Sequence, residues 1–485
     1  MADLSFLWHD YETFGRVPRR DRPAQFAGVR TDAELNEIDA PVMWFCQPAP
    51  DTLPDPESVL LTGILPQQAL AQGMPEHAFA AAIEMQLARE GTVGVGYNSI
   101  RFDDEVTRFL FWRNLIDPYA REWQNGCGRW DLLDVVRCTW ALRPEGIQWP
   151  LTPEGERKGK PSFRLEHLTQ ANGLAHEAAH DALSDVRATI ALARLIRTQQ
   201  PRLWDFCLKL RSKHEVWAEI GTGKPFLHLT GMYPVERGCM AIVWPLAAHP
   251  TNKNELIVWD LAQDPSVLGT LDADTVRRLM FTRQDQLAEG EQRLPIKTIH
   301  VNKSPIVIGN LKTLGAAEKR WPLDVPLAMQ HAQAAVRLGR TLDSLWPAVF
   351  QRPDADHPVD VDEDLYGGFL SQQDRRSLDR LRGLSPSALA HKQPAFEDTR
   401  LEELLFRYRA RNFAHTLDAD DRARWQQHLA ARLHQGPAGG LSLAAYFERI
   451  DTLAEQPGVD EDPRALALLE SLVDYAQSIA PEHDG

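Results

Sequence analysis

The stretch Leu7-Trp8-His9-Asp10-Tyr11-Glu12-Thr13-Phe14-Gly15 decides the fold of the first part of the chain. Its apolar start predicts a strand that enters a core, and side chains two residues apart on a strand point to the same face. Asp10 and Glu12 would therefore lie side by side, where two unpaired carboxylates repel and are costly to bury. A divalent cation such as Mg²⁺ would offset that cost, because it binds carboxylate oxygens. A solvent-facing strand edge is the alternative, and Asp-x-Glu alone does not decide between the two.

The composition indicates a globular protein with more than one domain. At 485 residues the chain is too long for one compact core, and its 43% hydrophobic and 25% charged residues are ordinary values for such a protein. No apolar run is long enough to cross a membrane, and the first residues have no secretory signal pattern. Five scattered cysteines lack metal-binding spacing, which predicts buried or free thiols in a reducing cytoplasm: Cys46, Cys127, Cys138, Cys207 and Cys239.

Arginines gather in one short loop of an otherwise acidic chain. The net charge of −15 argues against a protein that coats nucleic acid non-specifically, so an enzyme acting on a polyanion would need its basic residues close together. From Arg16 to Arg22, four of seven residues are arginine, and nearby glycine and proline predict a loop. An arginine-rich loop beside two carboxylates favours contact with phosphate, and a solvated charged turn is the alternative.

A third acidic position follows a second expected strand. Residues 93–98 have the small, apolar pattern of a strand, and a helix is expected after them with Asp103 and Asp104 near its start. Serving only as the helix cap is the alternative role for either aspartate. Gly94 and Gly96 do not form a nucleotide-binding fingerprint, because the third glycine is missing, and they are expected to allow close packing of strands.

The last acidic position lies on a helix expected from about residue 181 to Ile196. The buried stripe of this helix is predicted to contain Leu183, Val186, Ile190 and Ala193. Asp185 lies one turn after Asp181, and His180 precedes the helix, where its ring can lean toward the same site. Taken singly, such a histidine is usually a cap or a surface residue, and such an aspartate is usually solvated.

Together, the three motifs resemble a known nuclease superfamily. Asp-x-Glu, Phe-Asp after the second strand and His-x4-Asp occur in the order found in the DEDDh exonucleases, an RNase H-like superfamily of 3′→5′ nucleases. The sister DEDDy group has a tyrosine at the position that Asp181 holds here. Six further segments resemble bacterial exonuclease I: His9–Gly15, Asp21–Phe26, Gly96–Asn98, Arg101–Arg108, Arg129–Asp134 and Ser162–Leu168.

The resemblance implies a fold, a reaction and a set of catalytic residues. The fold would be an α/β RNase H-like exonuclease domain, with a mixed sheet flanked by helices. The reaction would be processive 3′→5′ hydrolysis of single-stranded DNA to 5′-mononucleotides, in DNA repair and recombination, by two Mg²⁺ ions for which Mn²⁺ may substitute. His180 matches the general base, and Asp103 is preferred to Asp104 because the family's aspartate directly follows the phenylalanine. The residues that match the metal ligands are Asp10, Glu12, Asp103 and Asp185.

Substrate and partner contacts are expected from residues near these motifs. The candidates for substrate contact are Glu12, Thr13, Phe14, Arg16, Arg22, Asn98 and Arg101. Phe14 would stack on the terminal nucleotide, and a core aromatic is an equally good interpretation. The resemblance also implies contact with the acidic C-terminal tail of single-stranded-DNA-binding protein, for which Arg143 matches a basic position. A monomeric, cytoplasmic and nucleoid-associated enzyme without membrane contact is expected.

Three regions are expected after the exonuclease domain, which is placed at residues 1–198. Short β-rich segments predict a β-module over residues 199–350, where the resembling family has an SH3-like domain. Residues 351–364 are acidic and contain prolines, which predicts a linker. Residues 365–485 are expected to form a helical domain, in which one helix has a core stripe made of Leu401, Leu404, Leu405 and Tyr408.

Basic residues in the later regions are candidates for contact with the DNA backbone. Lys303 and Lys312 follow the last clear strand of the β-module, and ordinary turn residues are the alternative. Arg400, Arg407 and Arg411 share one face of a helix, and a solvated helix face is the alternative. If all of these basic residues line one groove, an acidic protein could hold a polyanion there.

Two other functions fit the same motifs less well. A 3′→5′ exoribonuclease would use the same site, because the motifs specify the reaction and not the sugar. A catalytically idle clamp for single strands is the candidate from another class. The intact set of four carboxylates and one histidine argues against the idle clamp, since idle relatives have no need to keep paired carboxylates.

Overall fold

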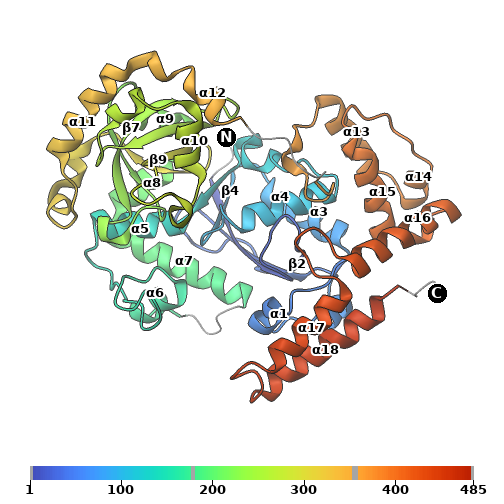
Figure 1. The fold of residues 1–485 in the computed structure, drawn as a ribbon. Helices are drawn as coiled ribbons and strands as arrows, with labels where there is room; N and C mark the ends of the chain where they lie inside the picture. The colour runs from blue at the N-terminus through green and yellow to red at the C-terminus, as the bar shows by residue number, and fades with distance from the viewer. Residues whose placement is uncertain (1–3, 176–180, 352–358, 482–485) are drawn as a thin grey trace. The chain divides into compact units, whose positions relative to one another are not determined.

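The computed structural model describes residues 4–175, 181–351 and 359–481 (Figure 1). Its internal contacts divide the chain into two compact units. The first unit contains residues 1–128, 177–187 and 357–485, and the second contains residues 129–176 and 188–356. The helical C-terminal region therefore belongs to the same unit as the first strand. The domain boundaries expected from the sequence stay predictions.

The first unit is built on a mixed sheet. Its strands follow the order β3-β2-β1-β4. Strand β1 (Ser5–Thr13) pairs antiparallel with β2 (Pro23–Thr31) and parallel with β4 (Thr92–Gly96), and β2 pairs antiparallel with β3 (Val42–Phe45). The helices between these strands and after them are α1 (Pro56–Thr62), α2 (Pro66–Gln72), α3 (Glu76–Leu87) and α4 (Asp103–Arg113). The expected α/β fold with a mixed sheet is confirmed.

The two faces of β1 have different surroundings. Leu7 and Tyr11 pack with residues of β2, α3 and α4 in one hydrophobic cluster, and neither is more than 4% exposed. Because side chains alternate along a strand, the side chains of Asp10 and Glu12 both point away from this cluster. The pairing register places Asp10 opposite Ala27 and Glu12 opposite Gln25, and it shifts between Glu12 and Thr13. The strand therefore delivers both carboxylates to one face, as the sequence predicts.

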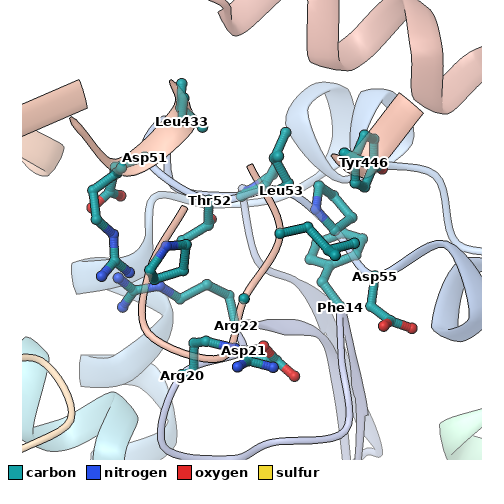
Figure 2. A pocket seen from close by; sticks show the side chains of 16 residues that line it. Phe14, Arg20, Asp21, Arg22, Asp51, Thr52, Leu53, Asp55, Leu433 and Tyr446 are labelled. Atoms are coloured by element: carbon teal, nitrogen blue, oxygen red, sulfur yellow. Dashed lines mark hydrogen bonds and ion pairs between the residues drawn. The ribbon is translucent and has the colours of Figure 1, made fainter. Parts of the chain in front are cut away.

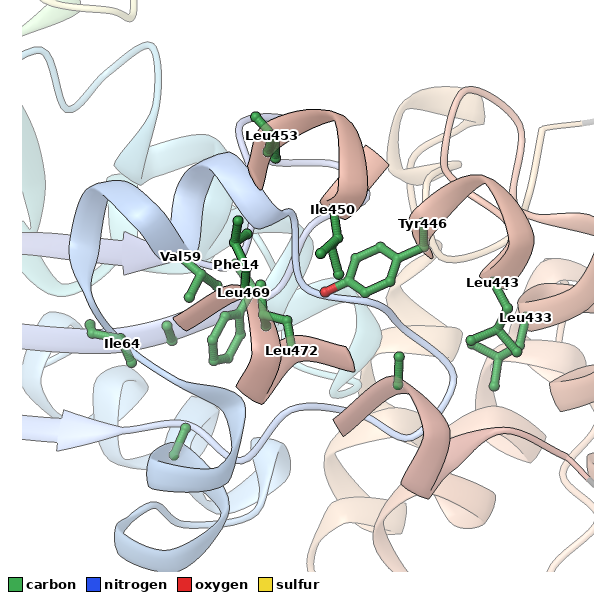
Figure 3. Packing of buried hydrophobic residues seen from close by; sticks show 13 residues of the cluster. Phe14, Val59, Ile64, Leu433, Leu443, Tyr446, Ile450, Leu453, Leu469 and Leu472 are labelled. Carbon is green, nitrogen blue, oxygen red and sulfur yellow. The ribbon is translucent and has the colours of Figure 1, made fainter. Parts of the chain in front are cut away.

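The C-terminal helices complete the first unit. They are α13 (Gln372–Arg382), α14 (Pro386–Ala390), α15 (Arg400–Asn412), α16 (Ala419–Ala430), α17 (Leu443–Ala454) and α18 (Pro463–Ile479). Helices α17 and α18 pack with α1 around Phe14, in a cluster that includes Val59, Ile450 and Leu472 (Figure 3). A second cluster joins Trp112 of α4 to α13 and α15. The stripe expected on α15 is confirmed, because its four residues are at most 6% exposed.

The acidic segment expected as a linker is packed where the structure describes it. Asp362 is 2% exposed and lies 3.4 Å from the guanidinium of Arg22 and 3.3 Å from that of Arg407. It also pairs with Arg411, whose Nη2 lies 2.6 Å from Asp51 Oδ2. This part of the segment is therefore held in place, because guanidinium groups surround its buried carboxylate, and its role as a linker stays a prediction.

The second unit contains an antiparallel sheet with the order β10-β6-β7-β8-β9. Its strands are β6 (Phe226–Leu229), β7 (Met240–Ala248), β8 (Glu255–Asp260), β9 (Ile296–His300) and β10 (Ile306–Ile308). The strands expected in the β-module are confirmed as β7, β8 and β9. The chain enters this unit through β5 (Gly128–Asp131), and α7 (Ala182–Gln199) spans the division between the units. The other helices are α5 (Leu132–Leu142), α6 (Leu165–Ala171), α8 (Pro201–Lys209), α9 (Lys213–Ile220), α10 (Ala273–Phe281), α11 (Val325–Leu338) and α12 (Leu345–Val349).

The structure also bears on two expectations from the composition, which concern the cysteines and membrane-spanning helices. All five cysteines are free and buried, as the sequence predicts. Burial raises the pKa of the Cys46 thiol well above its ordinary value, which makes this side chain unreactive near neutral pH. Among the described residues, no helix is both long and apolar enough to cross a bilayer.

Candidate active site

Three carboxylates come together near the end of β1. Asp10 and Glu12 come from β1 itself, and Asp185 comes from the first turns of α7; one oxygen atom of each lies within 4.8 Å of the others. Carboxylates at this spacing repel one another unless a cation lies between them, and oxygen ligands suit hard divalent cations. The structure therefore brings together three of the four residues expected to bind metal.

Asp103 reaches the same strand through a backbone hydrogen bond. The pairing between β1 and β4 runs as far as Trp8 and Val95. Beyond that point the amide of Tyr11 donates a hydrogen bond to Asp103 Oδ1 at 3.1 Å. The side-chain carboxylate thus takes the place of a backbone carbonyl on a neighbouring strand. Burial and then the charge of Asp10 hold the pKa of Asp103 well above its ordinary value. The fourth expected ligand is thus attached to the strand that carries the first two.

Asp104, the neighbour of Asp103, has a different partner. Its side chain is almost fully buried and accepts a hydrogen bond from Arg121 Nη2 at 2.6 Å. Arg121 is 2% exposed and belongs to a single 3-10 turn, Ala120–Glu122. The structure therefore separates the two adjacent aspartates, since Asp103 lies against β1 and Asp104 is held in an ion pair.

The carboxylates of the site hold protons more tightly than ordinary ones. Burial, followed by the charge of Asp185, raises the pKa of Asp10 to about 8. Burial, followed by the charges of Asp10 and Asp185, raises the pKa of Glu12 to about 9. A cation bound here must displace these protons, so its binding should strengthen as the pH rises toward these values.

The start of α7 is fixed by a local cap. The amide of Ser184 donates to Asp181 Oδ2 at 3.0 Å, and the amide of Asp185 donates to the carbonyl of Asp181 at 3.0 Å. Asp181 therefore caps the helix that carries Asp185. His180, expected as the general base, lies outside the described residues, and its role stays a prediction.

The arginine-rich loop is only partly available to a substrate. Arg22 is 2% exposed, and its guanidinium lies 3.5 Å from Glu76 and 3.4 Å from Asp362. This side chain is buried and paired with two carboxylates, and its contact with the substrate stays a prediction. Arg16 is exposed. A small pocket lies beside the loop, and Figure 2 shows its lining, which includes Arg20, Asp21, Arg22, Asp51, Asp55 and Tyr446.

Other expected substrate contacts have mixed surroundings. Phe14 is 4% exposed and packs as a core aromatic in the cluster of Figure 3, and its stacking on the terminal nucleotide stays a prediction. Thr13 Oγ1 donates to the carbonyl of Gly15 at 2.6 Å, which shapes the turn after β1. Asn98 has a φ of 65°, in the left-handed region, at the turn between β4 and α4, and Arg101 is exposed in the same turn.

The arginines of α15 do not form a free basic face. Arg407 Nε lies 2.7 Å from Glu403 and its Nη1 lies 2.8 Å from Asp360. Arg411 is held between Asp51 and Asp362, and Arg400 is held by Asp398 and lies over the ring of Trp112. The expectation that this face follows DNA phosphates is wrong, because acidic residues close by and far away in the sequence neutralise it. Lys312 is exposed, and whether Lys303 and Lys312 contact DNA stays a prediction.

An exposed aromatic group was missed by sequence reasoning. The side chain of Phe369 is 85% exposed, and its ring centroid lies 6.0 Å from that of Tyr119. Arg108 lies 5.2 Å above the ring of Tyr119, and Tyr366 is 50% exposed and bonds to Glu105. Large exposed aromatic residues are informative because most are buried. No local signal distinguishes Phe369 from a core phenylalanine, since its exposure depends on the packing of distant segments.

Arg143 lies in a pocket of the second unit. It ends α5, and its guanidinium donates to the carbonyls of Leu142 and Thr313 at 2.6 Å and 3.1 Å. The pocket is lined by Cys138, Leu142, Arg143, Gln200, Pro201, Arg202, Leu203, Phe206, Ile308 and Thr313. Apolar side chains thus adjoin two arginines. Only Arg143 was identified from the sequence, because the other lining residues come from three separate segments.

Three family models together match most of the chain. Residues 7–193 match an exonuclease model, residues 211–352 match an exonuclease I SH3-like domain, and residues 359–479 match an exonuclease I C-terminal domain. The exodeoxyribonuclease I of Escherichia coli (strain K12) is 44% identical over 484 residues, with 98% of each chain covered.

Solved structures agree with this comparison. Exonuclease I from Methylocaldum szegediense is 47% identical, with a TM-score of 0.91 over 98% of this chain and 99% of that one. E. coli exonuclease I in complex with a dA16 oligonucleotide is 42% identical, with a TM-score of 0.92 over 99% of this chain and 100% of that one. A zinc-bound form of the E. coli protein with single-stranded DNA matches at 43% identity and a TM-score of 0.89, again over 99% and 100% of the two chains.

Proposed function

Because the chain belongs to the exodeoxyribonuclease I family, we propose that it hydrolyses single-stranded DNA processively from the 3′ end to 5′-mononucleotides. The observation that carries the proposal is the approach of Asp10, Glu12 and Asp185 to within 4.8 Å of one another. In this proposal the enzyme works in the cytoplasm as a monomer, in DNA repair and recombination.

The residues of the site fit a pair of divalent cations. Burial and mutual repulsion raise the pKa values of Asp10 and Glu12, and a bound cation would offset that repulsion. The donor set is made of carboxylate oxygens, which favours Mg²⁺, with Mn²⁺ as a substitute. In the proposal the ligands are Asp10, Glu12, Asp103 and Asp185. Two such cations would activate the attacking water and stabilise the departing 3′-oxygen.

The protein's own residues position the substrate and move the proton. Glu12, Thr13, Asn98 and Arg101 stay candidates for contact with the terminal nucleotide, and Arg16 stays a candidate for a phosphate because it is exposed. His180 would accept the proton of the attacking water, since an ordinary histidine pKa of about 6.5 suits a base near neutral pH.

The direct test uses labelled substrates of several kinds. Single- and double-stranded DNA and single-stranded RNA are incubated with Mg²⁺ or with EDTA, and the products are sized on a gel. Mononucleotides released only from single-stranded DNA, from its 3′ end and only with Mg²⁺, are the expected result. Equal degradation of RNA would change the assigned substrate, and activity in EDTA would reject the metal site.

His180 should determine how the rate of hydrolysis falls at acidic pH. If it is the base, the rate falls as the pH drops through an apparent pKa near 6.5, because the protonated ring cannot accept a proton. The His180→Ala variant should lose most of the rate at neutral pH and flatten this limb, as measured by initial rates between pH 5 and pH 9. A variant with the same pH profile as the unmodified enzyme would assign the base role to another group.

The strand is proposed to run over the exposed aromatic residues of the first unit. Bases stack on aromatic rings with roughly 1–3 kcal/mol each, whatever their sequence. Phe369→Ala should therefore shorten the run of nucleotides removed per encounter on a long strand, and it should change hydrolysis of a trinucleotide little. Runs are measured with an excess of unlabelled trap DNA.

The control for this prediction is Phe281→Ala, which removes a ring that is 57% exposed in the second unit. It should leave the run length unchanged. An equal loss on long and short substrates for Phe369→Ala would indicate that Phe369 supports the fold or the active site and does not guide the strand.

The pocket around Arg143 is proposed to bind the acidic tail of single-stranded-DNA-binding protein. Arg143 and the exposed Arg202 would pair with carboxylates, and Leu203, Phe206 and Ile308 would accept an apolar side chain. Arg143→Ala should weaken binding of such a peptide by about 10-fold, as measured by fluorescence anisotropy. Hydrolysis of protein-free DNA should not change.

A matched arginine provides the control for the tail pocket. Arg283 is exposed in the same unit and pairs only locally, with Asp285. Arg283→Ala should bind the peptide as the unmodified protein does. If both variants lose affinity equally, the interaction is a general charge effect and not recognition by this pocket.

A further inference from the structure

A buried ion pair lies directly beside the proposed metal ligands. Asp104 and Arg121 meet at 2.6 Å, and their side chains are 2% and 1% exposed. Asp104 follows Asp103 in the first turn of α4, so the pair acts on the turn that carries a proposed ligand. Because neither group reaches solvent, salt screens this interaction little.

The guanidinium of Arg121 fits beneath strand β4. A Cβ atom at Gly94 would lie 3.3 Å from Arg121 Nη1 and 3.4 Å from His9 Nε2, closer than most side-chain contacts. The glycine therefore allows Arg121 to approach the sheet next to His9, the residue before Asp10. This also explains Gly94 as a packing residue, as the sequence predicts.

Arg121 has few other attachments. Among the described residues, its Nε and Nη1 atoms have no hydrogen-bond partner, and neither ring nitrogen of His9 has one. Within the described residues, the hydrogen bond from Nη2 to Asp104 is therefore the one that holds this guanidinium. The position of this guanidinium is consequently fixed by Asp104.

Without Arg121, Asp104 would lose the cation with which it forms a buried ion pair. The first turn of this helix contains Asp103, Asp104 and Glu105. A buried carboxylate that loses its guanidinium partner would either take up a proton or turn toward another cation, because burying its charge is costly. Turning toward the cations would move Asp103 away from the amide of Tyr11, to which it is bonded at 3.1 Å.

We propose that Arg121 is a positioning residue for the metal site, which neutralises Asp104 and so keeps Asp103, and not Asp104, against β1. The inference rests on the proposed function, since it assumes that Asp103 contributes to cation binding. Arg121 touches neither substrate nor cation in this proposal. It acts through the orientation of the helix start.

The test compares three variants by direct metal binding. Mn²⁺ is titrated against the full-length protein without DNA, and free Mn²⁺ is measured by electron paramagnetic resonance. Arg121→Met should weaken Mn²⁺ binding by about 10-fold or more, the usual effect of losing a residue that orients metal ligands. The Mg²⁺ concentration for half-maximal hydrolysis should rise by a similar factor, while KM for DNA stays nearly constant.

A second substitution separates positioning from folding. Adding Asp104→Asn to Arg121→Met removes the charge that Arg121 neutralised and keeps the shape, so Mn²⁺ binding should return to within about 3-fold of the unmodified protein. If Arg121→Met does not fold, Arg121→Gln replaces it, because glutamine removes the charge but keeps a hydrogen-bond donor. Failure of Asp104→Asn to restore binding would overturn the proposal.

Arg113 provides the matched control. It lies at the other end of α4, is 2% exposed, and pairs with Glu76 at 3.4 Å. Arg113→Met should lower the thermal unfolding midpoint about as much as Arg121→Met but leave Mn²⁺ binding unchanged. Equal weakening in both variants, or none in Arg121→Met, would overturn the positioning role.

One further variant distinguishes this inference from the proposed function. Asp10→Ala should abolish tight Mn²⁺ binding. If Asp10→Ala binds Mn²⁺ normally, the metal site itself is wrongly assigned. If Asp10→Ala loses Mn²⁺ and Arg121→Met does not, only the role of Arg121 is rejected.

Discussion

Replacing Asp10 or Asp185 with alanine is expected to reduce hydrolysis of single-stranded DNA by about 10³-fold or more. Each substitution removes one of the carboxylates that lie within 4.8 Å of one another, and with it the charge that holds the cations. Metal ions supply several kcal/mol of transition-state stabilisation, and about 4 kcal/mol corresponds to 10³-fold in rate. The measurement is the initial rate of mononucleotide release at saturating Mg²⁺.

Binding of DNA should survive these substitutions. The proposed contacts with the strand, such as Phe369, do not involve the carboxylates, so affinity for a long single strand in EDTA should change little. Asp274→Ala, on the exposed first turn of α10, should keep full activity and serves as the control. If Asp10→Ala or Asp185→Ala kept near-normal turnover, the two-metal assignment would be wrong.

Replacing Asp362 with asparagine is expected to lower the free energy of unfolding by about 3–5 kcal/mol, the usual cost of breaking a buried ion pair. The carboxylate is 2% exposed and lies among Arg22, Arg407 and Arg411, which would keep their charges without this partner. Urea unfolding at pH 7 measures the change. Asp364→Asn, which removes a partly exposed carboxylate paired with Arg400, should cost much less.

The same carboxylate should make stability depend on acid. Burial alone would raise the pKa of Asp362, but Arg411 and Arg22 lower it far below the ordinary value of about 3.9. Because the folded pKa is depressed, this contribution to stability is complete above about pH 4 and is lost as the pH falls below that value. The unmodified protein should therefore lose stability between pH 5 and pH 3 more steeply than Asp362→Asn. Parallel curves for both proteins would indicate that Asp362 is not charged in the folded state.

Features that depend on local periodicity could be predicted from the sequence. The alternation along β1 places Asp10 and Glu12 on one face, and the helical spacing of residues 401–408 predicts the buried stripe of α15, whatever the rest of the chain does. The strands β7, β8 and β9 follow from short β-rich segments with turns between them. Each of these signals lies within about ten residues, and local sequence is sufficient to determine such elements.

The roles of charged residues could not be predicted in this way. Arg22 and Arg411 look like phosphate contacts in the sequence, but their partners lie 340 and 360 residues away, at Asp362 and Asp51. Whether an arginine faces solvent or a buried carboxylate depends on which segments meet, and helix or strand periodicity carries no information about that. The exposure of Phe369 escaped prediction for the same reason.

The sequence by itself determined that two carboxylates of β1 share a face and that Asp185 follows on a helix, because the residue spacing sets these directions. The order of the motifs identified the family. The resemblance preferred Asp103 to Asp104 as a ligand, and only the tertiary structure shows how differently the two side chains are surrounded. Adjacent residues at a helix start have nearly the same local sequence, and their different surroundings depend on Arg121, 17 residues from Asp104, and on the amide of Tyr11, 92 residues from Asp103. Burial makes both bonds strong enough to fix which carboxylate faces β1.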